Sequence, residues 1–105
     1  MISMGDNVHI ASGVTFVNHD ITCMMFDYMD REHKHRERFG EIKIGSNVFI
    51  GSNSMILYDV TISNNVIIGA GSVVTRNIPN NCIAVGVPCK VIGCFEDYKK
   101  RFENR

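Results

Sequence analysis

A six-residue repeat dominates this sequence and restricts the folds that it can adopt. Read from Ile44, successive hexads are IGSNVF, IGSNSM, ILYDVT, ISNNVI, IGAGSV and VTRNIP, and MGDNVH, IASGVT and FVNHDI keep the same spacing earlier in the chain. The first position of each hexad is apolar, the fourth is usually Asn, Asp or Gly, and the fifth is mostly small or β-branched. Because Asn, Asp and Gly tolerate left-handed backbone angles, the repeat predicts short strands separated by tight corners.

Three such strands would close one triangular coil, and stacked coils would bury the apolar first positions as a continuous column. The predicted fold is therefore all-β, a parallel β-helix of hexapeptide repeats. The predicted corner residues are Asn7, Gly13, His19, Asn47, Asn53, Asp59, Asn65, Gly71 and Asn77. A β-sandwich with coincidental spacing is the alternative, and the apolar first position of all nine hexads argues against it.

Residues 22–41 interrupt the repeat and are predicted to protrude from the coil as a loop. Four of its apolar residues could pack against a neighbour: Phe26, Tyr28, Met29 and Phe39. Its polar segment REHKHRER is interpreted as a solvated tip. A loop of this length is usually functional or disordered.

The repeat ends near Ile92, and the spacing of Phe95, Tyr98 and Phe102 is typical of a short amphipathic helix. The expected organisation is one β-helix domain over residues 1–93, with the insertion at 22–41. A helical extension over residues 94–105 follows it.

Composition limits the function classes. With 105 residues the chain is one small domain, and its 11 basic and 11 acidic residues argue against a broad nucleic-acid or membrane surface. No apolar run is long enough to span a bilayer. The four cysteines lack both metal spacing and CxxC pairing, which favours reduced thiols and a cytoplasmic location.

Four segments resemble the hexapeptide-repeat acyltransferases, in particular the galactoside, maltose and capsular-polysaccharide O-acetyltransferases. They are MGDNVHIASGVTFVNHD, IKIGSNVFIGSNSMIL, VIIGAGSVVTRNIP and AVGVPCKVIG. The resemblance implies left-handed coiling, against the usual crossover rule. It also implies acetyl-coenzyme A as co-substrate without a metal, a sugar or polysaccharide-precursor acceptor, and a homotrimer with active sites between subunits. Members of this family usually have more sequence upstream, including acceptor-binding residues. Either a short or truncated form, or another chain that covers this end of the coil, is therefore expected here.

His19 has two interpretations. Its place in the repeat predicts a corner residue. By resemblance it is the general base that deprotonates the acceptor hydroxyl, with Asn18 and Asp20 orienting it or facing the acceptor. A neutral imidazole with a pKa near ~6.5 suits that role. Its place directly before the insertion and the unusual Asp20 beside it favour catalysis.

The resemblance also implies a set of donor-binding residues. The set comprises Phe49, Gly51, Ser52, Ala70, Gly71, Ser72, Thr75, Arg76 and Lys90. Phe49 fills an aromatic position that is often Trp in the family. Arg76 and Lys90 would face phosphates or adenine, and plain surface charge is the alternative for both.

Two other functions remain open at this stage. One is a non-enzymatic trimeric scaffold or an inactive shortened relative. The other is a zinc enzyme of the γ-carbonic-anhydrase type, which needs three converging histidines. The spacing of His9, His19, His33 and His35 does not favour it.

Overall fold

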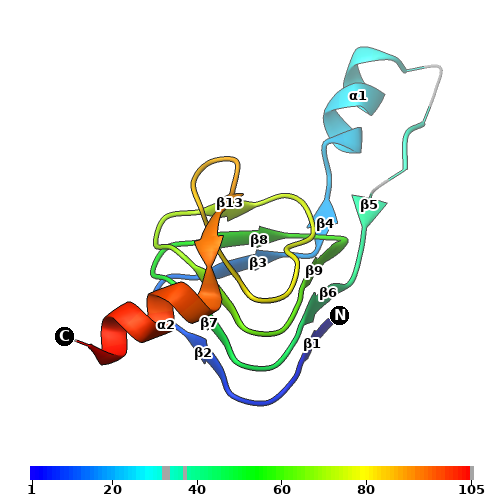
Figure 1. Cartoon of the computed structure of the whole chain (residues 1–105). Coiled ribbons are helices and arrows are strands. Elements are labelled where there is room, and N and C mark those ends of the chain that lie inside the picture. Colours follow the sequence, from blue (N-terminus) through cyan, green and yellow to red (C-terminus); the bar gives the residue numbers. More distant parts are fainter. Residues whose placement is uncertain (32–33, 37, 105) are drawn as a thin grey trace.

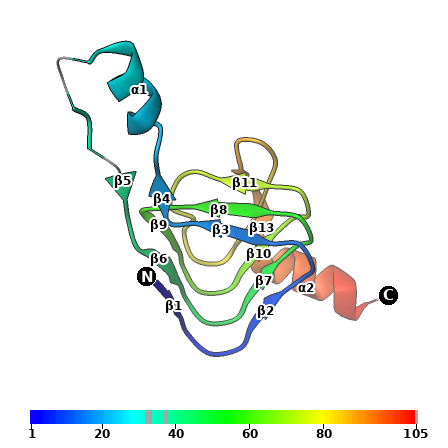
Figure 2. The same cartoon turned by 180° about the vertical axis from the view of Figure 1, so that it is seen from behind.

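The computed structural model describes residues 1–31, 34–36 and 38–104. The chain winds through stacked coils, and each complete coil contributes one strand to each of three parallel sheets (Figures 1 and 2). The first coil contains β1 (Ile2–Met4), β2 (Val8–Ile10) and β3 (Thr15–Val17). The second contains β6 (Ile42–Ile44), β7 (Val48–Ile50) and β8 (Met55–Leu57), and the third β9 (Val60–Ile62), β10 (Val66–Ile68) and β11 (Val73–Val74). This confirms the predicted parallel β-helix.

The three sheets are joined by three corners. The first sheet has the order β1-β6-β9, the second contains β2-β7-β10 followed by β12 (Cys82–Val85), and the third has the order β3-β8-β11. We call the turn from the first to the second sheet the first corner. The second corner leads from the second to the third sheet, and the third corner leads back to the first sheet.

The spacing between stacked residues changes along the helix. At the first corner, residues that stack between neighbouring coils are 40 positions apart across the insertion, then 18 apart, and then 16 apart. The last coil is therefore shorter than the repeat predicts. Ile78, assigned to a fifth position, bridges Ile62 in the apolar column and is 3% exposed. Asn81, with φ of 60°, is the first-corner residue of this coil. Asn77 follows β11 at the third corner but is not among the residues of positive φ, so the left-handed conformation predicted for it is wrong.

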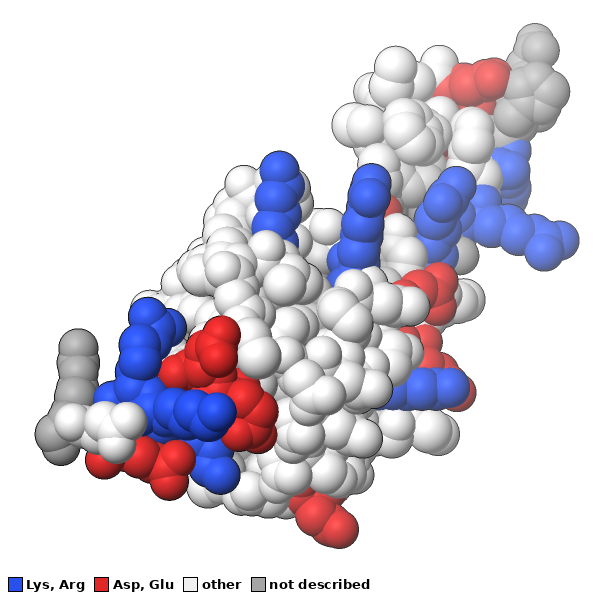
Figure 3. Space-filling model, viewed as in Figure 1, with Lys and Arg blue, Asp and Glu red and all other residues white. Residues whose placement is uncertain are grey.

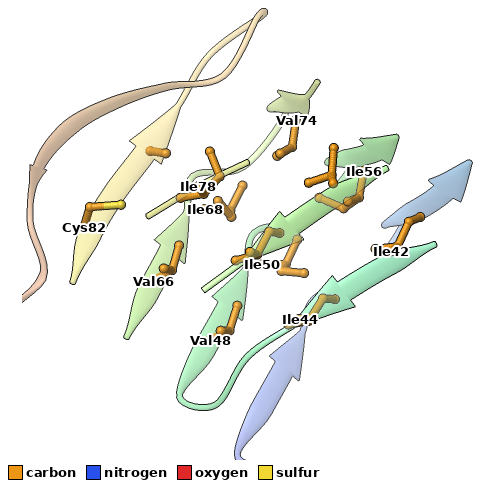
Figure 4. Packing of buried hydrophobic residues seen from close by; sticks show 13 residues of the cluster. Ile42, Ile44, Val48, Ile50, Ile56, Val66, Ile68, Val74, Ile78 and Cys82 are labelled. Carbon is orange, nitrogen blue, oxygen red and sulfur yellow. The ribbon is translucent and has the colours of Figure 1, made fainter. Parts of the chain in front are cut away.

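The first positions of the hexads form the core, as predicted (Figure 4). Ile50, Ile56 and Ile62 are each 0% exposed, and they pack between the coils with the valines of the fifth positions. The first coil differs, because its first-position residues Met4 and Ile10 are 45% and 41% exposed. The described core thus lies in the second and third coils and in Ile78, Cys82 and Ala84, which follow them.

A ladder of asparagine amides runs along the first corner. Asn7 Nδ2 donates to Asn47 Oδ1 at 2.9 Å, Asn47 donates to Asn65 at 3.1 Å, and Asn65 donates to Asn81 at 2.8 Å. All four residues have φ between 57° and 60°. Asn suits these positions for two reasons. It tolerates this backbone conformation, and its amide both donates and accepts hydrogen bonds.

Substitutions at Asn47 separate these two contributions. Asn47→Gly keeps the backbone conformation and removes the ladder bonds, so we expect a loss of about 1 kcal/mol. Asn47→Ala also forces a Cβ into the left-handed region, and we expect about 2 kcal/mol. Urea unfolding at equal chain concentration measures both. Asn53→Gly is the control, since Asn53 has φ of 61° at the second corner, outside the ladder. Equal losses for Asn47→Gly and Asn53→Gly would contradict a stabilising ladder.

The insertion forms an arm that projects from the third corner (Figures 1 and 2). We predicted a loop, but the arm contains β4 (His19–Asp20), α1 (Cys23–Met29) and β5 (Arg38–Phe39). β4 and β5 pair antiparallel at its base. Residues 32, 33 and 37 of the predicted polar tip lie outside the described residues, and the other tip residues are exposed.

The chain ends in a hairpin and a helix. β13 (Lys90–Cys94) runs antiparallel to β12 and leads into α2 (Phe95–Glu103), which confirms the predicted C-terminal helix. Phe95 is half-buried beside the first corner, whereas Tyr98 and Phe102 are 42% and 71% exposed.

Candidate functional site

His19 lies at the base of the arm, immediately after the chain leaves the third corner of the first coil. It belongs to β4 and pairs with Phe39, and it is not among the residues of positive φ. The interpretation of His19 as a corner residue is therefore wrong, because the repeat stops at Val17 and the chain continues straight into the arm. A different reason is needed for a histidine at this place.

The imidazole of His19 is exposed and adjoins a cavity. Its Nδ1 lies 3.1 Å from Asn18 Oδ1, an arrangement in which Nδ1–H donates and Nε2 is the nitrogen that can take a proton. The cavity, of about 490 Å³, is lined by Met1, Asn18, His19, Phe39, Gly40 and Glu41. Asn18 is thus a hydrogen-bond partner of the His19 ring beside this cavity.

The walls of this cavity are tied to the coil by backbone hydrogen bonds. Gly40 N donates to Asn18 O at 3.1 Å, and Ile42 N donates to Met1 O at 3.0 Å. Both ends of the arm are therefore fixed to neighbouring backbone where His19 lies. A general base needs such fixed geometry before its chemistry matters.

Asp20 is hydrogen-bonded to Thr22 and to Tyr58. Neighbouring residues of a strand point to opposite faces, and Asp20 lines a separate cavity of about 390 Å³ with Arg36, Arg38 and Tyr58. Its carboxylate accepts hydrogen bonds from the backbone N–H of Thr22 at 2.8 Å, from the Thr22 hydroxyl and, at 3.4 Å, from the Tyr58 hydroxyl. The Thr22 hydroxyl and backbone bonds, then Tyr58 and the charge of Arg38, hold the pKa of Asp20 below its usual value.

Asp20 therefore ties the arm to the second coil through Tyr58. Sequence reasoning missed Tyr58, although its position offered a signal. It directly follows β8 at the third corner, stacked next to the point where the arm leaves the first coil.

Five of the predicted donor residues, Ser72 included, lie at the second corner. Gly51 N donates to Ile68 O and Gly71 N donates to Ser52 O, both at 2.8 Å, so these turns stack directly. Ala70 and Gly71 are exposed, and a Cβ at Gly71 would meet nothing within 4 Å. A ligand could approach this part of the backbone closely. Gly51 is buried, and a Cβ there would lie 2.5 Å from Ala70 N, so coil stacking alone requires a glycine.

The side chain of Ser72, another predicted donor residue, points into the coil. Its side chain is 0% exposed, its Oγ donates to Gly69 O at 2.6 Å, and it accepts from Gly86 N at 3.1 Å. The small side chain fits inside the β-helix, and its hydroxyl forms hydrogen bonds with backbone groups there. An unpaired polar group in this place would be costly.

The remaining predicted donor residues are exposed but dispersed. Phe49 lies on the outer face of the second sheet and is 42% exposed. Thr75 and Arg76 follow β11 at the third corner, and Lys90 begins β13. Within one chain the structure brings Ser52, Ala70 and Gly71 together at the second corner, and it places His19 at the third.

On the face shown in Figure 3, acidic and basic side chains intermingle, in particular where α2 lies. In the part of the chain that the structure describes, no group of three or more His, Cys, Asp and Glu residues could hold a metal ion. His33 of the zinc alternative lies outside those residues. Within residues 1–31, 34–36 and 38–104, no helix is long and apolar enough to cross a membrane.

Comparisons with known proteins agree with this architecture. The family model described as "Bacterial transferase hexapeptide (six repeats)" matches residues 41–76. Galactoside O-acetyltransferase of Escherichia coli K12 is 41% identical over 101 residues, which are 96% of this chain and 48% of that protein. Protein CapG of Staphylococcus aureus is 46% identical over 101 residues, which are 96% of this chain and 57% of CapG.

A solved structure, galactoside acetyltransferase in complex with coenzyme A, superposes with a TM-score of 0.79 at 40% identity. The match covers 94% of this chain and 48% of that one. The likeness confirms the predicted left-handed coiling. The chain spans about half the length of the curated relatives that it matches.

Proposed function

We propose, from the premise that this chain belongs to the bacterial hexapeptide-repeat transferases, that it transfers an acetyl group from acetyl-coenzyme A to a hydroxyl of a sugar or polysaccharide precursor. The observation that carries the proposal is the exposed His19 beside a cavity, with its Nδ1 held by Asn18. The galactoside acetyltransferase that binds coenzyme A and the name CapG support the choice of donor and acceptor class.

The reaction follows from the two ring nitrogens. Nε2 of His19 would take the proton of the acceptor hydroxyl. At the same time the hydroxyl oxygen would attack the thioester carbonyl carbon of acetyl-coenzyme A. The bond to sulfur then breaks, and the thiolate leaves as coenzyme A after it takes up the proton from the imidazole. The hydrogen bond to Asn18 would keep one proton on Nδ1 throughout the reaction. The proton taken from the acceptor would then be carried by Nε2 alone.

The separation of His19 from the second corner supports an active site shared between subunits. We propose a homotrimer in which His19 of one chain faces Ser52, Ala70 and Gly71 of the next, with Phe49, Thr75, Arg76 and Lys90 along the donor path. The arm offers a contact surface for a neighbour, because Met25, Phe26 and Tyr28 of α1 are 54%, 44% and 74% exposed. We place the enzyme in the cytoplasm, where acetyl-coenzyme A is available.

Subunit mixing tests this arrangement. His19→Ala removes the base and Ala70→Trp blocks the donor corner, so each variant alone is expected to be inactive. Trimers assembled from equal amounts of both contain sites with an intact His19 and an intact neighbouring corner. We expect the mixture to recover about a quarter of wild-type activity, as random assembly in a cyclic trimer predicts.

The mixture is prepared by co-refolding, and light scattering verifies that each sample is a trimer. Self-mixed samples of each variant are the controls. Absence of recovery from mixed trimers would contradict a shared site. A monomeric mass would contradict both the trimer and the site built on it.

A further inference from the structure

His9 is a second histidine in a built environment, and the proposed function does not use it. It lies in β2 on the outer face of the second sheet, in register with Phe49 of the next coil. Together with Phe49, Ile67 and Phe95 of α2 it lines a cavity of about 250 Å³. Asn7 and Asn47 of the asparagine ladder complete the polar part of the lining.

The ladder determines which nitrogen of His9 carries the proton. Asn7 uses its Nδ2 to donate to Asn47, so its Oδ1 is the atom that meets His9 Nε2 at 2.8 Å. An amide oxygen only accepts, so Nε2 must be the donor. In the neutral ring Nδ1 is then the hydrogen-bond acceptor.

The lining matches the chemistry of a saccharide. A sugar presents hydroxyl groups at its edge and C–H groups on its face. The hydroxyls can donate to His9 Nδ1, and the C–H face can pack on the rings of Phe49 and Phe95. A cavity with apolar walls and a few fixed polar groups is typical of a small-molecule site.

The cavity adjoins the proposed donor path through Phe49 and lies away from the second corner. The cavity lies at the first-corner end of the second sheet, next to Asn7 and Asn47. Ser52, Ala70 and Gly71 lie at the opposite end, where the strands run into the second corner. Phe49 lies on the strand that joins these corners, lines the cavity and belongs to the proposed donor path.

We propose that His9 is a specificity-determining residue that accepts a hydrogen bond from a hydroxyl of the saccharide acceptor, in the cavity between the second sheet and α2. Its assignment to the acceptor rests on the proposed function. The saccharide subsite itself rests on the cavity and on the fixed imidazole, and both can be tested without turnover.

Two variants of the same site provide the test. His9→Leu fills the space without an acceptor, and His9→Asn places an amide oxygen near the position of Nδ1. We expect His9→Leu to raise the KM for a saccharide acceptor about tenfold, the effect of one lost hydrogen bond, with kcat much less affected. His9→Asn should restore most of the loss. Acetyl-coenzyme A binding, measured by calorimetry, should be the same in both variants.

Two measurements decide the inference independently of activity. Nitrogen-15 NMR of the imidazole should show the proton on Nε2 in the wild type, and loss of its hydrogen bond in Asn7→Ala should shift the Nε2–H resonance. Saturation-transfer NMR with methyl glycosides of glucose, galactose and mannose should detect binding to the wild type and to His9→Asn, and binding weaker by about tenfold to His9→Leu.

The proposal is overturned by a proton on Nδ1, by the absence of saturation transfer from every glycoside, or by a loss of acetyl-coenzyme A binding in His9→Leu. If glycosides bind through His9 but no acetyl transfer occurs, the proposed function fails and the saccharide subsite stands.

Discussion

His19→Ala is expected to lower kcat for acetyl transfer by about a hundred- to ten-thousand-fold, the usual contribution of a general base. The acetyl-coenzyme A thioester is already activated, so the main barrier that the protein can lower through this residue is deprotonation of the hydroxyl. The side chain is exposed, and its loss removes no core contact. We therefore expect the free energy of unfolding and the affinity for acetyl-coenzyme A to stay close to wild type.

Release of coenzyme A thiol in the presence of a saccharide acceptor measures this effect. Asn18→Ala is the matched variant, because it keeps the imidazole and removes only the hydrogen bond to Nδ1. We expect it to lose about tenfold in kcat, which corresponds to one hydrogen bond. Wild-type turnover in His19→Ala would exclude the histidine as the base.

Ile50→Ala is expected to destabilise the protein by about 2–5 kcal/mol, the range for truncation of a fully buried isoleucine. Ile50 is 0% exposed and lies between the first and third coils, where its neighbours in register are Ile10 and Ile68. A cavity there would interrupt the apolar column. A loss of this size is a large part of the total stability of about 5–15 kcal/mol that is common for a domain.

Ile10→Ala is the control for this prediction. Ile10 occupies the same column one coil away but is 41% exposed, so its truncation should cost clearly less. Urea unfolding at one chain concentration compares the two variants. Similar losses for Ile10→Ala and Ile50→Ala would mean that the open end of the column is covered in solution, and would contradict the core described here.

The repeat predicted the fold well because one physical rule acts at every hexad. An apolar first position, a corner residue that tolerates positive φ and a small fifth position together specify a strand, a turn and a strand. The prediction failed where the chain departs from the six-residue spacing. The last coil is shorter, so Ile78 and Asn81 take over positions that the unbroken count gives to other residues.

The candidate site was predictable only in part. The resemblance predicted His19 as the general base. The strand conformation of His19 excludes the alternative that it is a simple corner residue. Sequence reasoning could not show that Asp20 turns to the opposite face and bonds Tyr58, because that contact joins residues from two coils. The inward orientation of Ser72 depends likewise on hydrogen bonds to Gly69 and Gly86. Motif spacing does not report which way a side chain points.

The most direct test of the central claim is a calorimetric titration of acetyl-coenzyme A into the purified chain, with Ala70→Trp as the matched variant. We predict saturable binding to the wild type and a strong loss in Ala70→Trp, since Ala70 is exposed at the proposed donor corner. No binding to a folded wild-type trimer would contradict an acetyl-coenzyme A-dependent transferase.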